Sequence, residues 1–332
     1  MRLRLLHPDP WKRGLLLAAL AVLLGLLMML HSQIPNRLGN LGSLIETFLP
    51  WLGAPLPALL AAGLWRRSAS ALIALLLPAT VWLNLFGGLL ADKSHPVTSE
   101  DFTVVTHNVA AGNPDPAGTA RDLAATGAAV LALQEVSEEA RDTYEKELAK
   151  AYPHHTVQGT VGLWSKLPLS DTEPLDIETD RGPLADTKPP DTRMTQTRAL
   201  RTTVTTAHGP LAVYVAHLGS VRINPRAGFW TDTRNRNARA LGHAITTEKN
   251  KRMLLLGDLN GTANDRAFSD ITSQLDPAQD RAGDGFGFTW PAASPMARID
   301  QILTKGLEPR NSWVLPATGS DHRPAAAAMR AW

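Results

Sequence analysis

The sequence predicts an α/β sandwich preceded by a membrane anchor. Residues 1–91 hold three long apolar stretches, each close to the length of a membrane-spanning helix. From residue 101 onward, short apolar runs typical of strands mix with helix-like segments, and two of these runs pair as a hairpin. The length of 332 residues permits one large domain or two ordinary ones.

Composition and charge exclude several kinds of chemistry. The chain has no cysteine, so it has no disulfide, no thiolate zinc site and no cysteine nucleophile. Residues 1–91 carry seven basic and two acidic residues, which leaves residues 92–332 with a net charge of −3. A mildly acidic domain lacks the basic surface that nucleic-acid binding needs, so we consider nucleic acid an unlikely partner.

Three apolar stretches are predicted to cross a membrane: residues 14–30, 44–65 and 69–91. The middle stretch contains three prolines and Glu46, so we interpret it as a kinked span. A signal peptide is the alternative for the first stretch, but no small-x-small cleavage site follows Leu30. The predicted partner of residues 1–91 is therefore the lipid bilayer.

The distribution of basic residues predicts the orientation of these spans. Four basic residues precede the first span, and Arg66 and Arg67 lie between the second and third, whereas the first loop has only Arg37. Basic residues favour the cytoplasmic side. We expect a multi-pass protein of the cell membrane with its N-terminus inside and everything after Ala91 outside. If the middle stretch does not cross, the orientation of the large domain inverts.

Beyond a polar linker at 92–100, the domain at 101–332 alternates irregularly between strands and helices. Strands are predicted from short apolar runs at 102–107, 128–133, 160–168, 200–206, 211–218, 253–256 and 298–303. Helices are predicted at 119–127, 137–151 and 232–250, and loops rich in Gly, Pro or polar residues at 179–197, 283–290 and 316–324. The turn 207–210 joins two of the strands as a hairpin.

The stretch Arg252–Asn260 is the most informative part of this domain. Its apolar run Met253–Leu256 is typical of a strand buried on both faces. Gly257 would permit a sharp exit from that strand. Asp258 and Asn260 would then lie where a strand opens into a loop, which is a common location for catalytic groups. A strand end closed by an Asx turn is the alternative.

Polar side chains of the same kinds recur at other strand ends. The set comprises Asn108, Glu135, His217, Asp258, Asn260, Asp300, Asp321 and His322. So many carboxylates, histidines and amides at strand ends suggest one shared site. Oxygen donors suit Mg²⁺ or Mn²⁺, and an acid–histidine pair can orient and charge an imidazole. A metal ion together with paired Asp and His side chains can catalyse the attack of water on phosphorus.

These residues lie in motifs that resemble the endonuclease/exonuclease/phosphatase superfamily. In chain order the motifs are Thr106-His107-Asn108, Leu133-Gln134-Glu135, Ala216-His217-Leu218, Gly257-Asp258-Leu259-Asn260, Thr289-Trp290-Pro291, Arg298-Ile299-Asp300-Gln301-Ile302 and Ser320-Asp321-His322. The resemblance covers residues 101–332. The added N-terminal anchor is similar to that of the membrane-bound actinobacterial VanJ-type members, which are associated with teicoplanin resistance.

The resemblance implies a four-layered sandwich of two packed β-sheets flanked by helices. It also implies that Glu135 binds the metal, Mg²⁺ or Mn²⁺, with Asn108 helping directly or through water. Asp321 would lie beside the metal or the water. These three residues are therefore the predicted metal-binding set.

The same resemblance assigns catalytic roles to five residues. His217 and Asn260 would hold phosphate oxygens, Asp258 would position or activate the attacking water, and Asp300 would orient His322. In the family the general base is assigned either to the Asp of the Gly-Asp-x-Asn motif or to the final His. The sequence leaves both assignments open.

Two further sets of residues have open interpretations. Arginines 222, 226, 234, 236 and 239 follow the histidine motif and could clamp a phosphate, but a solvated helix face is the preferred interpretation for most of them. Aromatic residues at 229–230 and 286–290 could touch a lipid or an aromatic ligand, and core packing is the alternative.

The leading functional hypothesis is an extracytoplasmic, membrane-anchored, metal-dependent phosphohydrolase. A lipid-linked phosphate or pyrophosphate of cell-wall synthesis is the predicted substrate, because the short linker confines the domain near the headgroups. A Mg²⁺-dependent nuclease or phosphodiesterase is one alternative. A non-catalytic binding or sensor domain is another, although a dead domain has no physical reason to keep charged groups buried.

Overall fold

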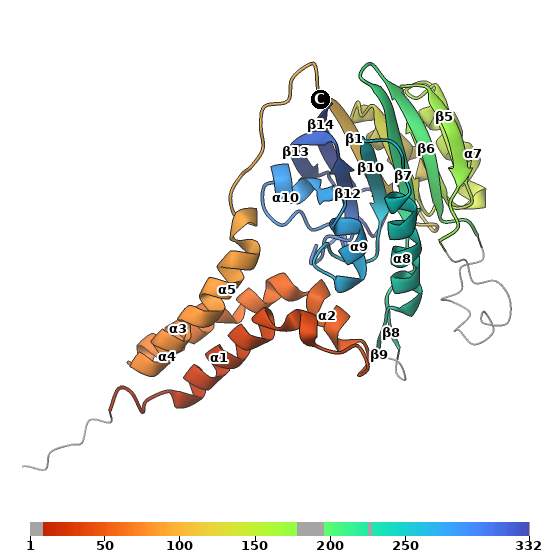
Figure 1. Cartoon of the computed structure of the whole chain (residues 1–332). Coiled ribbons are helices and arrows are strands. Elements are labelled where there is room, and N and C mark those ends of the chain that lie inside the picture. The colour runs from red at the N-terminus through yellow and green to blue at the C-terminus, as the bar shows by residue number, and fades with distance from the viewer. Residues whose placement is uncertain (1–8, 178–195, 225–227, 332) are drawn as a thin grey trace, which may run out of the picture. The chain divides into compact units, whose positions relative to one another are not determined.

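A computed structural model describes residues 9–177, 196–224 and 228–331 of the chain (Figure 1). The chain forms two compact units, Met1–Leu90 and Ala91–Trp332, and each is described here by itself. Most of the predicted loop 179–197 lies outside the described residues.

The N-terminal unit consists of apolar helices joined by short 3₁₀ turns. In chain order they are α1 (Leu15–Met29), η1 (His31–Gln33), α2 (Leu41–Thr47), η2 (Leu49–Gly53), α3 (Pro55–Trp65), α4 (Ala69–Ala74), α5 (Leu76–Phe86) and η3 (Gly87–Leu89). The last three form one helical stretch, Ala69–Leu89, whose residues are mostly apolar. Among the described helices it is the one long and apolar enough to span a membrane by itself.

The structure therefore supports fewer spans than the three predicted. Helix α1 has 15 residues and covers only about 22 Å at ~1.5 Å per residue, short of a ~30 Å bilayer core. The predicted middle span is two helical pieces bent by 75° between Thr47 and Leu49. Pro50 and Pro55 lie in the first turns of η2 and α3, where a missing N–H costs no hydrogen bond, but proline there separates successive helices.

The second unit is built on two six-stranded sheets, and this confirms the predicted α/β class. The first sheet has the order β13 (Leu307–Val314), β14 (Ala325–Ala331), β1 (Phe102–Asn108), β2 (Val130–Gln134), β4 (Val161–Ser165) and β3 (His154–Gln158). The second has the order β11 (Asp276–Pro277), β12 (Asp300–Lys305), β10 (Met253–Asp258), β7 (Gly209–His217), β6 (Ala199–Thr206) and β5 (Leu169–Pro174). A separate hairpin pairs β8 (Arg222–Asn224) with β9 (Gly228–Trp230).

Alternating side chains of β10 show how the layers form. Leu254 and Leu256 lie in the core between the two sheets, whereas Met253 and Leu255 pack on the outer face. The helices of that outer face are α8 (Asp232–Thr246) and α9 (Ser269–Thr272), with the turn η6 (Arg266–Phe268) (Figure 1). The first sheet is covered by α6 (Pro116–Ala125) and α7 (Glu138–Leu148), while α10 (Ala278–Ala282) adds Ala278 to the central core. Two sheets with helices on both outer faces give four layers.

Helix starts follow local capping chemistry. The Asp115 carboxylate accepts from the N–H of Gly118 at the start of α6, and the Ser137 hydroxyl accepts from Ala140 at the start of α7. Each satisfies a donor that would otherwise lack a partner in the first turn. Helix α8 ends at Thr246, four residues before the predicted end.

Several strands were not predicted from the sequence, and the most important is β14. Its residues are mostly alanines, which are poor strand formers. The strand nevertheless lies between β1 and β13 near one end of its sheet, where buried Ala325–Ala328 pair with both neighbours. Strands β3, β5, β8, β9, β11 and β13 were also missed.

Gly257 does not end its strand, as the sequence suggested, but lies within β10. A Cβ at this position would lie 1.9 Å from the carbonyl oxygen of Ala216 on β7. The glycine is therefore required for the close approach of two parallel strands just before their polar ends.

Candidate active site

Strand ends bring most of the predicted polar residues to one edge of the sandwich. Asn108 ends β1, His217 ends β7 and Asp258 ends β10. In the second sheet the strand register places Asp258 opposite His217 on one side and Asp300 on the other. All four of these side chains are buried. Register therefore sets three of the functional groups in one row.

Asp300 and His322 form the acid–histidine pair that the resemblance implied. His322 Nδ1 lies 2.9 Å from Asp300 Oδ2, and its Nε2 lies 3.8 Å from Asp258 Oδ2. Ser320 fixes the loop that carries the histidine, since its hydroxyl donates to the Asn108 carbonyl at 2.6 Å and accepts from the His322 N–H at 3.1 Å. The imidazole is thus held between two carboxylates.

Burial and neighbouring charges set different protonation states on these groups. Burial lowers the pKa of His322, but the charges of Asp300 and Asp258 outweigh it and raise the pKa to about 10. Burial raises the pKa of Asp258 to about 7. For His217, burial and the positive charge of Arg198 lower the pKa well below its usual range. At neutral pH the site holds a charged His322 and a neutral His217.

Glu135 and Asn108 lie together beside Asp258. Asn108 Nδ2 donates to Glu135 Oε1 at 3.1 Å and to Asp258 Oδ2 at 3.0 Å. Glu135 itself has a left-handed backbone, with φ of 59°, and its other carboxylate oxygen accepts from the Ala111 N–H at 3.0 Å. Its side chain is 31% exposed and is therefore partly accessible to solvent. This oxygen-rich donor set fits a hard divalent cation such as Mg²⁺.

Asp321 is the third predicted metal ligand. Its side chain is exposed, and its backbone oxygen accepts from the Ala292 N–H at 2.7 Å. Among the residues that the structure describes, the group of three whose ligand atoms lie within 4.8 Å of one another is Asp258, Asp300 and His322. The charge of Asp321 contributes to the raised pKa of His322.

Asn260 takes part in the Asx turn that the sequence offered as the alternative interpretation of this strand end. Its N–H donates to Asp258 Oδ1 at 2.8 Å, which is an Asx turn, and its φ is 51°. Its side-chain amide donates to the Leu218 carbonyl at 3.0 Å and lies 3.3 Å from Asp258 Oδ2. In this state the amide orients Asp258 and the end of β7.

Arg198 is a functional candidate that sequence reasoning missed. Its guanidinium contacts both ring nitrogens of His217, while its Nε is buried without a hydrogen-bond partner among the described residues. The carboxylates of Glu135 and Asp258 are close enough to stabilise its charge. The observed β6–β7 register, which pairs Ala199 with Ala216, places Arg198 opposite His217, and the N–H of His217 donates to the Arg198 carbonyl at 2.8 Å. The predicted hairpin, with its turn at 207–210, did not give this register.

Arg234 corrects the preferred interpretation of the arginines that follow the histidine motif. It is fully buried at the start of α8 and pairs with Asp265 at 2.6 Å. It also donates to the Asn260 carbonyl at 3.2 Å and lies over the Phe268 ring. Arg234 is therefore neither solvated nor placed to clamp a phosphate, and instead supports the loop after β10. Arg226 lies outside the described residues.

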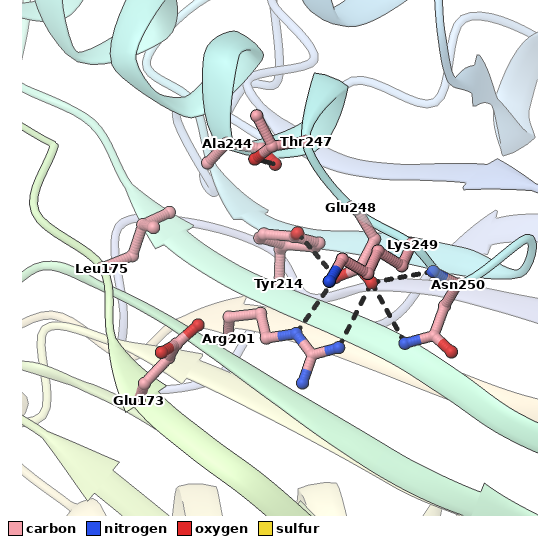
Figure 2. Close-up of a pocket in the computed structure, with 9 residues that line it drawn as sticks. All are labelled: Glu173, Leu175, Arg201, Tyr214, Ala244, Thr247, Glu248, Lys249 and Asn250. Atoms are coloured by element: carbon pink, nitrogen blue, oxygen red, sulfur yellow. Dashed lines mark hydrogen bonds and ion pairs between the residues drawn. The ribbon is translucent and has the colours of Figure 1, made fainter.

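A separate cavity of about 390 Å³ lies between β5, β6, β7 and the end of α8 (Figure 2). Glu248 accepts from Arg201 Nε at 3.0 Å, from the Tyr214 hydroxyl at 2.9 Å and from the Asn250 N–H at 2.8 Å. The Glu248 carboxylate is thus engaged within the protein, as the dashed contacts in Figure 2 show. This network joins α8 to the sheet, and none of the predicted site residues lines the cavity.

Comparisons with known proteins agree with this fold. Residues 105–322 match the Endonuclease/Exonuclease/phosphatase family. No curated protein matches the chain. Solved structures do: a functionally unknown conserved protein from Enterococcus faecalis V583 shares 15% identity, with a TM-score of 0.56, and the match covers 69% of this chain and 100% of that one.

Two further similar structures are of proteins identified by name. A humanized D. rerio TDP2 carrying 14 mutations shares 18% identity with a TM-score of 0.54, covering 70% of this chain and 99% of that one. Sphingomyelinase C from Streptomyces griseocarneus shares 21% identity with a TM-score of 0.51, covering 69% and 99%. At these identities the likeness shows the fold alone.

The four-layered sandwich with carboxylates and histidines at one edge is consistent with the family match over residues 105–322. The chain belongs to the endonuclease/exonuclease/phosphatase family. Members of this family are generally phosphoester hydrolases and depend on divalent metal ions.

Proposed function

We propose that this protein is a membrane-anchored, metal-dependent phosphoester hydrolase that acts on a lipid-linked phosphate or pyrophosphate at the outer face of the cell membrane. The observation that carries the hydrolase is the buried Asp258 between His217, Asp300 and the Asn108–Glu135 pair. Burying a carboxylate costs free energy, and a buried group whose pKa is strongly perturbed by burial and by specific charged neighbours is a candidate for catalysis.

The protonation states favour Asp258 over His322 as the general base. His322 has a pKa of about 10 and is already protonated at neutral pH, so it cannot accept a proton from water. Asp258, with a pKa of about 7, is poised near the operating pH. In this proposal Asp258 takes the proton of the attacking water, and His322 Nε2 gives a proton to the leaving oxygen.

Arg198 and His217 serve the phosphoryl group. Neutral His217 donates one ring N–H, and the buried guanidinium of Arg198 offers donors and positive charge to non-bridging oxygens. Glu135 and Asn108 would hold the divalent cation, which when bound stabilises negative charge on the phosphate. Asp321 would act on this region from the exposed edge through its charge.

The membrane part of the proposal rests on the N-terminal unit and the start of the catalytic unit. Helical stretch Ala69–Leu89 is apolar enough to span a bilayer. Three spans, oriented by the basic residues that flank them, would place the catalytic unit outside. Shortly after it, the N–H of Lys93 donates to Gly283 and that of His95 to Arg310. Segment 92–100 is thus bound to the catalytic unit rather than free, which restricts the site to a short distance from the membrane.

The test is a substrate panel with the full chain in detergent and Mg²⁺. We expect phosphate release from polyprenyl pyrophosphate or a lipid-linked precursor at a higher kcat/KM than from a soluble phosphomonoester. Asp258→Asn is the inactive control, because it keeps the shape of the side chain but cannot accept the proton. No phosphate release from any lipid-linked compound, together with efficient DNA degradation, would replace this proposal with the nuclease hypothesis.

A further inference from the structure

Exposed hydrophobic side chains of the catalytic unit concentrate beside its site. Among the described residues of this unit, four large hydrophobic side chains are exposed: Val97, Ile223, Trp290 and Met296. Val97 belongs to the segment that follows the anchor. The other three lie on two loops that adjoin the site residues. Single exposed hydrophobic residues are ordinary on protein surfaces, so their shared location is the feature to explain.

The first of these loops is the β8–β9 hairpin, which begins five residues after His217. Ile223 is 85% exposed and lies opposite Phe229 in the hairpin register. The neighbouring Arg222 is close enough to Arg198 for its charge to lower the pKa of that guanidinium. The hairpin therefore adjoins the site. Its Arg222 places a positive charge next to the exposed apolar side chain of Ile223.

The second loop carries Trp290 and Met296 and is bound to the acid–histidine pair. The Met296 N–H donates to the Trp290 carbonyl at 2.8 Å. One residue earlier, the Thr289 hydroxyl accepts from the Asp300 N–H at 3.3 Å, and the Thr289 carbonyl accepts from Arg323, which follows His322, at 2.8 Å. Trp290 and Met296 are 37% and 39% exposed, respectively.

We propose that Ile223, Trp290 and Met296 form an interfacial rim that enters the headgroup region of an anionic bilayer. The rim would orient the catalytic site towards the lipid headgroups. This inference rests on the proposed function. It names the surface by which the site reaches its substrate. Isoleucine, tryptophan and methionine gain free energy by leaving water, and tryptophan favours the membrane interface.

The chain itself indicates that a lipid bilayer is what covers this rim. The catalytic unit follows the apolar stretch Ala69–Leu89 after only a few residues, so a membrane that takes up that stretch lies within reach of the unit. Arg222 adds a positive charge beside the rim, which favours anionic headgroups. A hydrophobic protein partner would have no such link to the chain.

The absence of cysteine makes a direct test simple. In the full chain, Ile223→Cys is labelled with an environment-sensitive fluorophore and reconstituted into vesicles containing anionic lipid. The matched control is Lys150→Cys, at an exposed position just past the end of α7. We expect a blue-shifted emission at position 223 that lipid-borne quenchers reduce, and a water-like emission at position 150.

Each outcome of the labelling decides the proposal. Water-like emission at position 223 in vesicles overturns it. A blue shift that lipid-borne quenchers leave unchanged also overturns it, because a protein surface then covers the rim. Quenching at position 223 supports it whether or not the protein hydrolyses lipid-linked phosphate, so failure of the proposed function remains a separate result.

A kinetic comparison tests whether the rim serves the substrate. We expect Ile223→Ser to lower kcat/KM about tenfold on a vesicle-borne lipid phosphate, since one buried hydrophobic side chain is worth roughly that factor. Turnover of a soluble phosphomonoester should be unchanged, which also shows that the variant is folded. Equal losses on both substrates would contradict the interfacial role, as would no loss on the vesicle-borne lipid.

Discussion

The acid–histidine pair shows how a few contacts set the chemistry of single residues. His322 lies between two carboxylates, and burial alone would lower its pKa. The neighbouring charges outweigh burial, so the imidazolium persists well above neutral pH. Asp258 experiences the opposite balance, because burial raises its pKa. His322 and Asp258 lie less than 4 Å apart, yet at neutral pH their protonation states suit an acid role for His322 and a base role for Asp258.

The first prediction concerns the alkaline limb of the pH profile. Asp300 is the largest cause that raises the pKa of His322, so Asp300→Asn should lower that pKa from about 10. Because the proton is then lost at lower pH, the alkaline fall in kcat/KM should move towards neutral pH. The control is Asp321→Asn, whose charge contributes least, and its alkaline limb should move less. An unshifted limb in Asp300→Asn would separate the aspartate from the titration of His322.

The second prediction concerns coupling between the two residues. At an alkaline pH that lies above the lowered pKa of His322 in Asp300→Asn but below the value of about 10 in the unmodified protein, Asp300→Asn, His322→Ala and the double variant should lose similar factors in kcat, because groups that act as a unit give non-additive losses. Steady-state kinetics of the three variants measure this directly. Multiplicative losses in the double variant would mean that the residues act independently.

The third prediction concerns the metal-binding set. Glu135→Ala should weaken Mn²⁺ binding by about tenfold or more, because it removes the most accessible carboxylate beside Asn108. Electron paramagnetic resonance of free Mn²⁺ measures the affinity without relying on activity. The exposed Glu139 on α7 provides the control, since Glu139→Ala should bind Mn²⁺ normally. Activity that survives excess chelator in the unmodified protein would contradict a metal requirement.

At the scale of elements, the site depends on the neighbouring strands and on the helix α8, which hold the end of β10 in place. Strand β10 places Asp258 in register with both neighbours, and Gly257 allows the close approach of β7. The loop that follows β10 is held by Arg234 on α8, which binds both Asp265 and the Asn260 carbonyl. A buried ion pair therefore maintains the position of a catalytic loop.

The fourth prediction tests this support. Arg234→Ala should destabilise the protein by about 3–5 kcal/mol, because it leaves the buried Asp265 carboxylate without its partner. The exposed Arg239 on the same helix is the control, and Arg239→Ala should change stability by less than about 0.5 kcal/mol. Chemical denaturation of the full chain in detergent provides the comparison. Equal stabilities of the two variants would refute the supporting role.

At the scale of the whole molecule, the chain joins an apolar helical unit to a catalytic unit of known family. One described stretch, Ala69–Leu89, meets the length and hydropathy of a span, and the bent α2–α3 region would form a second only as a broken one. Three crossings would place the N-terminus and the catalytic unit on opposite sides of the membrane. The number of crossings therefore decides which compartment the site faces.

The fifth prediction is the membrane topology. The basic residues before the first apolar stretch and the pair Arg66–Arg67 favour the cytoplasm, so three crossings should place the C-terminus outside. A reporter that is active only outside the cell should work when fused after Trp332 and fail when fused after Arg67. A C-terminal fusion that is active only in the cytoplasm would reverse the topology and remove the outer-face substrate from consideration.

The sequence by itself predicted the α/β class, both faces of β10 and the polar residues at strand ends. It could do so because these features depend on short-range patterns: an unbroken apolar run, a turn of small residues, and charged side chains where a run stops. Resemblance to a family then related distant motifs to one another and implied the four layers. The family comparison and the two flanked sheets confirm that part of the reading.

Only the tertiary structure decided the features that depend on distant neighbours. The alanines of β14 form a strand because β1 and β13 pair with them, whereas their local preference is helical. Arg234 is buried because Asp265 and Phe268 surround it, although its helix looked solvated in sequence. The pKa values of Asp258 and His322 likewise depend on burial and on charges from other strands and loops, and no local pattern encodes those distances.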